Sequence, residues 1–151
     1  MYPPKLEEII ALFESLSDPE KREALISYAD GAKNQGPREG EVFDLEDVRK
    51  DEECTDTVGV FLRVNPDHTS HFRITLGPQV QTLTKAMTSI LCKGLEGLTP
   101  QEVLDVPADF VPRIVGADLV RQRSQTVYYI LTRMKGVAKV WLNRKRAADL
   151  A

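Results

Sequence analysis

The chain has 151 residues, of which 42% are hydrophobic and 28% are charged, with a formal net charge of -3. This length suits one domain with its own hydrophobic core, so we expect residues 1–151 to form a single domain. No segment is apolar for long enough to cross a bilayer or to act as a signal-peptide core, which predicts a soluble, cytoplasmic protein without a membrane partner. Two cysteines exclude a disulfide framework.

The charge is segregated along the chain. Acidic side chains outnumber basic ones in residues 1–56, whereas residues 119–148 contain arginines and lysines and no acid. The basic run 144–146 is typical of a solvated helix end, and no aromatic residues interleave with it as a stacking platform. We therefore expect no nucleic-acid partner. Binding through residues 121–146 stays an alternative that predicts an affinity falling steeply with salt.

Two helices are predicted at the start of the chain. Apolar residues recur at helical spacing over residues 4–16. Ser17-Asp18-Pro19-Glu20 supplies a cap, a first-turn proline and a favourable acid, which predicts a second helix over about 19–31. Residues 32–46, which contain three glycine or proline positions among many polar side chains, indicate a surface loop.

A β-hairpin follows. Residues 48–53 predict a short, weak strand, and clear apolar alternation over 57–64 and 70–76 predicts two antiparallel strands with one buried face. The turn between them falls at Asn65-Pro66-Asp67-His68. A helical stripe then runs from Val80 to Gly94.

The end of the chain is helical again. Thr99-Pro100-Gln101-Glu102 fits a capped short helix through Leu104, and Asp118 is expected to cap the last helix. The order of elements predicts an α+β fold, with a small antiparallel sheet of about three strands packed against helices on one face.

Cys54 is the candidate nucleophile. It follows the acidic run 51–53 and precedes the predicted strand at 57–64, and a thiol where a loop enters a strand can react. Cys92 falls inside an apolar helical pattern, where a thiol usually behaves as a small buried hydrophobe. His68 and His71 have a His-x-x-His spacing, but zinc sites need more ligands, so we expect both in a solvated turn and no metal.

Three local patterns resemble the SufE family of sulfur-acceptor proteins. Cys54-Thr55-Asp56-Thr57-Val58 resembles Cys-Gln-Ser-x-Val, and residues 97–104 resemble Gly-x-Thr-Pro-x-Glu-Ile-Leu. Leu119-Val120-Arg121-Gln122-Arg123-Ser124 resembles Leu-Ser-Pro-x-Arg-Ser. The likeness spans roughly residues 4–140 and implies a SufE/IscU-like fold. The chain departs from it at Glu53, where the family has glycine, and at Thr55-Asp56.

The resemblance implies a role in iron–sulfur cluster assembly. Cys54 would take a persulfide sulfur from a pyridoxal-phosphate cysteine desulfurase (SufS-like), stimulate that enzyme, and pass the sulfur to a scaffold protein (SufB-like). Arg123 would be the basic residue that faces the cysteine loop. The chain would need no cofactor of its own and would act as an accessory sulfurtransferase-like protein rather than a stand-alone enzyme.

The acidic flank of Cys54 leaves a second hypothesis open. Four carboxylates near Cys54 in sequence disfavour its thiolate, which Arg123 or a positive desulfurase surface would oppose. The alternative is an adaptor that binds the desulfurase and raises its activity without taking sulfur.

Overall fold

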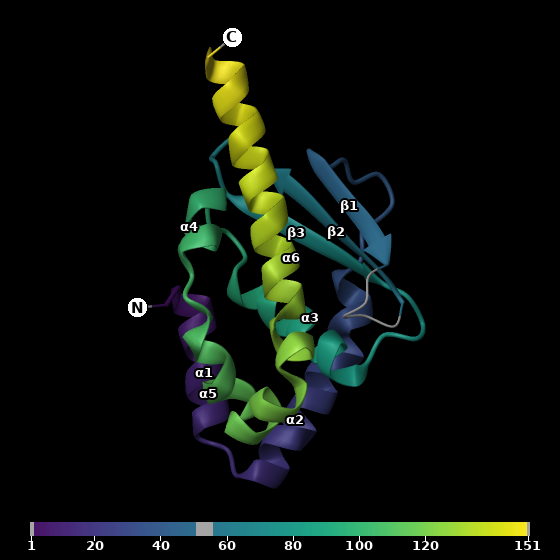
Figure 1. Cartoon of the computed structure of the whole chain (residues 1–151), viewed down its shortest axis with the longest axis vertical. Coiled ribbons are helices and arrows are strands. Elements are labelled where there is room, and N and C mark those ends of the chain that lie inside the picture. Colours follow the sequence, from purple (N-terminus) through teal and green to yellow (C-terminus); the bar gives the residue numbers. More distant parts are fainter. Residues whose placement is uncertain (1, 51–55, 151) are drawn as a thin grey trace.

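A computed structural model of the chain describes residues 2–50 and 56–150 (Figure 1). The described part contains a three-stranded sheet and a set of helices, which confirms the predicted α+β class. The strands are β1 (Leu45–Lys50), β2 (Thr57–Val64) and β3 (Ser70–Leu76). The α-helices are α1 (Pro4–Glu14), α2 (Asp18–Asp30), α3 (Thr82–Gly94), α4 (Pro100–Asp105), α5 (Val111–Val115) and α6 (Ala117–Leu150), with 3-10 turns η1 (Gly31–Gln35) and η2 (Ala108–Phe110).

The sheet is an antiparallel meander in the order β1-β2-β3. Val60 pairs with Ile74 and Leu62 with Phe72, so alternate residues of β2 and β3 turn the same apolar face toward the helices. These side chains are at most 3% exposed. The predicted hairpin is therefore confirmed in its strand bounds and in its buried face.

The helices lie on one face of that sheet. Figure 1 shows α6 crossing in front of the strands, with α3 behind it and α1, α2 and α5 gathered toward the end of the molecule opposite the C-terminus. Helix α3 contacts α1, α2 and α6, and its Met87, Ile90 and Leu91 have no exposed surface. Burying each of these side chains contributes about 1.5–3 kcal/mol, which makes α3 the centre of the core.

The predicted N-caps Ser17 and Thr99 are present at the starts of α2 and α4. Glu20 N donates to Ser17 Oγ at 3.4 Å while Ser17 N donates to the Glu20 carboxylate at 2.9 Å. Thr99 and Glu102 form the same reciprocal pair at the start of α4. Residues 97–104 therefore act as a folding motif, since each cap satisfies backbone donors that the helix cannot satisfy itself.

Several sequence-based boundaries were wrong. The weak strand predicted at 48–53 begins earlier, at Leu45, because β1 is an edge strand whose charged residues hide the alternation. Val80 is buried but precedes α3, whose cap is Gln81. Asp118 does not cap the last helix, because α6 already begins at Ala117 and Asp118 lies in its first turn.

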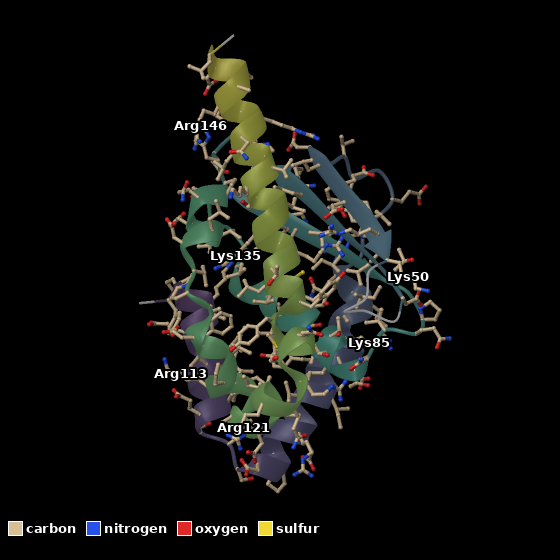
Figure 2. The ribbon with its side chains drawn as sticks, viewed as in Figure 1. Lys50, Lys85, Arg113, Arg121, Lys135 and Arg146 are labelled. Atoms are coloured by element: carbon tan, nitrogen blue, oxygen red, sulfur yellow. The ribbon has the colours of Figure 1, made fainter. Side chains whose placement is uncertain are left out.

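The last helix extends beyond the rest of the molecule. Figure 2 places Arg146 on this projecting part of α6, and all residues from Asn143 to Leu150 are exposed. Within the described ranges 2–50 and 56–150, no helix combines the length and apolar character that a membrane crossing requires.

Candidate functional site

Cys54, the predicted nucleophile, lies in segment 51–55, outside the described residues. The segment follows Lys50, the last residue of β1, and leads through Asp56 into β2. Lys50 pairs with Thr57 across the two strands. The antiparallel pairing of β1 and β2 therefore brings Lys50 and Thr57 together, and segment 51–55 lies between these two residues in the sequence.

Asp56 fastens the second of these ends to a distant part of the chain. Its carboxylate accepts hydrogen bonds from Thr57 N at 2.7 Å and from Gln79 N at 2.8 Å. These backbone donors, the Gln79 N–H first and the Thr57 N–H next, lower the pKa of Asp56, and the charge of Lys50 adds to the effect. Asp56, one of the four acids near Cys54 in sequence, is therefore kept ionised by the hydrogen bonds that its carboxylate accepts.

Gly77 leaves the space that the Asp56 carboxylate needs. A side chain added at Gly77 would come nearer to the Asp56 carboxyl atoms than the 3.0 Å that real Cβ atoms respect. Gly77 and Pro78 also border a hollow of about 700 Å³ between α2, η1, β3 and α3, where Lys33 and Lys85 bring positive charge. In Figure 2, Lys50 lies at the end of β1 and Lys85 on α3 below it. The charge of Lys50 therefore acts on Asp56, and Lys33 and Lys85 line the neighbouring hollow together with Asp30.

Arg133 fastens β1 and β2 to α6. Its side chain is 2% exposed, and its Nη2 donates to Asp47 O at 2.7 Å and to Val58 O at 3.0 Å. Nη1 donates to the Tyr129 hydroxyl at 2.6 Å. Nε lies 3.4 Å from the Asp47 carboxylate, as an ion pair rather than an aligned hydrogen bond. One guanidinium therefore joins both strands that lead to the Cys54 segment.

Arg123, the second predicted site residue, lies at a break within α6. Its backbone has φ -136° and ψ 38°, which is not helical, so α6 consists of two helical parts that meet there. The side chain is exposed and forms no salt bridge with another described residue. It borders a hollow of about 440 Å³ with Arg22, Gln81 and Thr82. Gln81 lies two residues after Gln79, whose N–H binds Asp56. Whether Arg123 reaches Cys54 remains a prediction, because Cys54 lies outside the described residues.

Comparison with known proteins identifies the family. The family model described as "SufE: Fe-S metabolism associated domain" matches residues 7–138. The chain belongs to the SufE family. This family is associated with iron–sulfur metabolism.

One curated protein and one solved structure are similar to this chain. The SufE chain is 32% identical over 109 residues to "SufE-like protein 1, chloroplastic/mitochondrial" of Arabidopsis thaliana, a match that covers 72% of this chain and 27% of that protein. The chain thus spans about a quarter of the length of this relative. It is also similar to the solution structure of a hypothetical protein from Thermus thermophilus, with a TM-score of 0.70 and 27% identity over 95% of this chain and 99% of that one.

The second thiol of the SufE chain is part of the core, as predicted. Cys92 is 4% exposed in α3. Burial raises the pKa of this thiol to about 12, and the charge of Glu96 adds to the shift. A thiol that is buried and protonated is a poor nucleophile, so Cys92 is unsuited to sulfur chemistry in the folded protein.

The two histidines differ in their surroundings. His68 lies exposed in the turn, as expected. His71 does not, because it is in β3, where Nδ1 is 2.9 Å from Glu96 Oε1 and Nε2 is 3.5 Å from Glu41 Oε2. The side chain of His71 is 15% exposed. Among residues 2–50 and 56–150, no three His, Cys, Asp or Glu side chains gather in a way that could hold a metal ion.

Sequence reasoning missed Arg133 and the task of Asp56. Arg133 was counted only as one of the basic residues of 119–148, although it follows Tyr129 by one helical turn within an otherwise apolar stripe. That position was a usable signal. The bond from Gln79 N to Asp56 had no sequence signal, since it joins residues that are distant along the chain.

Proposed function

We propose that this chain is a sulfur acceptor and carrier in iron–sulfur cluster assembly, with Cys54 as the acceptor and residues 1–151 acting as one SufE-like domain. The observation that carries the proposal is the burial of the other thiol, Cys92. Cys92 is withdrawn into the core of α3 with a strongly raised pKa, which leaves Cys54 as the thiol for chemistry in a SufE-family chain. The partners would be a cysteine desulfurase (SufS-like), which the chain would stimulate, and an iron–sulfur scaffold protein (SufB-like), and the cytoplasm would be the compartment.

The proposed step is a thiol exchange. The Cys54 thiolate attacks the outer sulfur of the desulfurase cysteine persulfide, a new S–S bond forms at Cys54, and the desulfurase thiolate leaves with the electron pair of the broken S–S bond. No external oxidant or reductant is needed, because the outer sulfur keeps its oxidation state. A nucleophile on the scaffold later removes that sulfur in the same way.

Arg123 is proposed as the basic residue that favours the Cys54 thiolate. Its freedom from salt bridges with other described residues and its place beside residues 81–82 support this role. The cations at Lys50 and Lys85 would further offset the acidic flank.

The experiment is sulfur loading of the purified, reduced protein. The protein is incubated with a cysteine desulfurase and L-cysteine, and its intact mass is measured and mapped by peptide. We expect the mass of one or more sulfur atoms to be added at Cys54. The adduct and the stimulation should both vanish in C54S and persist in C92S, which is the matched control.

An adaptor that takes no sulfur is the alternative. It predicts stimulation of the desulfurase that survives in C54S, with no adduct in the wild-type protein. This pattern would replace the relay with a binding role, and the absence of both effects would reject both functions.

A further inference from the structure

Arg133 is a buried cation whose hydrogen bonds connect three elements. It comes from α6, and its Nη2 bonds reach the backbone oxygens of Asp47 in β1 and Val58 in β2. Removing a guanidinium from water is costly, and an apolar side chain of similar volume often serves a core equally well. A buried arginine whose N–H groups bond to two neighbouring strands is therefore expected to fix the position of these strands.

The location of those strands indicates what is fixed. β1 ends at Lys50 and β2 starts at Thr57, so they carry the two ends of the segment that contains Cys54. Helix α6 also carries Arg123 at its break. The guanidinium of Arg133 therefore links β1 and β2, which flank the segment with Cys54, to α6, which carries Arg123.

We propose that Arg133 is a positioning residue for Cys54. By bridging β1 and β2 to α6, it holds both ends of the Cys54 segment in a constant place relative to α6. This inference rests on the proposed sulfur-acceptor function. Arg133 itself contacts no reacting atom, and it acts through the strand pair.

The test compares three variants of Arg133 with a matched core variant. R133M keeps much of the apolar stem but loses the donors, and R133K keeps the charge but lacks the planar fork that can serve two carbonyl groups. R133Q, which is polar but too short to span both strands, takes the place of R133M if that variant does not fold. The control is M134A, a truncation of the neighbouring residue, which has no exposed surface.

The first readout is hydrogen exchange of the free protein, which needs no partner. In R133M the amides that pair β1 with β2 should exchange roughly tenfold faster or more, while those that pair β2 with β3 stay within about threefold of wild type. In M134A any change should spread over the core without this contrast between the two strand pairs.

The second readout is the rate of sulfur acceptance at varied desulfurase concentration. R133M and R133K should lower the maximal rate by roughly tenfold, because misplacement of a nucleophile reduces productive attack. The concentration for half-maximal rate should stay within about twofold, since docking is unchanged. D47N removes the ion pair between Arg133 Nε and the Asp47 carboxylate but keeps the bond to the backbone oxygen of Asp47, so its effect should be smaller than that of R133M.

Three results would overturn the inference. R133M could match M134A in both readouts, R133K could restore both to wild-type values, or the loss could lie wholly in the half-maximal concentration. A wild-type protein that gains no sulfur would instead reject the proposed function, and the exchange data alone would then decide whether Arg133 holds the strands.

Discussion

Replacing Gly77 by alanine tests the anchor at the end of the Cys54 segment. The new methyl group would overlap the Asp56 carboxyl group, which is held by Thr57 N and Gln79 N at 2.7 and 2.8 Å. The carboxylate must swing away and give up these hydrogen bonds, or the β3–α3 connection must move. Gly77 is not among the glycines with positive φ, so its backbone adds no penalty for alanine.

The magnitude follows from two opposing effects. Overpacking costs about 1–3 kcal/mol, and the lower entropy of the unfolded alanine chain returns about 0.4–1 kcal/mol. We expect G77A to lower the free energy of unfolding by about 1–2 kcal/mol, measured by urea denaturation with an unchanged m-value. In a D56A background the overlap disappears, so G77A should become neutral or stabilising by about 0.4–1 kcal/mol.

Gly136 provides the matched control for this cycle. It lies inside α6, and apart from its chain neighbours and the adjacent helix backbone no described atom lies within 4 Å of the place that an alanine Cβ would occupy. G136A should therefore stabilise the protein by about 0.5–1 kcal/mol in either background. An equal cost of G77A with and without Asp56 would refute the steric coupling between Gly77 and the Asp56 carboxylate.

Two further predictions concern titrating groups. Because the pKa of Asp56 lies below its usual value of 3.8, its stabilising effect is present above that value and is lost as the pH falls through the folded pKa. The stability advantage of wild type over D56N should therefore shrink in acid urea titrations, and a constant difference would contradict it. Burial raises the pKa of Cys92 to about 12, so in C54S iodoacetamide at about pH 8 should label Cys92 only after unfolding. Fast labelling of folded C54S would show that Cys92 is accessible.

The acidic flank of Cys54 has a different meaning once Asp56 is placed. In the sequence, Asp56 is one of four carboxylates that oppose a thiolate. In the structure its charge faces two backbone N–H groups and lies near Lys50, which compensate it. The residue that departs from the family pattern at this position therefore serves as an anchor, which makes it compatible with a sulfur-acceptor site.

Local patterns predicted most of the fold. Alternation gave the bounds of β2 and β3, and the Ser17 and Thr99 capping boxes marked two helix starts, because both signals depend on neighbours in sequence. β1 was placed too late and His71 was assigned to a solvated turn. In both cases the deciding contacts, Leu45 with Leu62 and His71 with Glu96, come from outside the local segment.

For the site, the sequence by itself determined which residue types are available: two cysteines in contrasting surroundings, and three motifs in SufE order. It also determined that Cys92 is a core thiol, since helical periodicity alone places it on the apolar side. Only the tertiary structure decided that Arg133 lies in the core and that Asp56 is bound to the β3–α3 connection. The presence of a charged residue in a sequence does not show whether its side chain is buried. Hydrogen bonds between segments that are distant in the sequence form only when the tertiary structure brings these segments together.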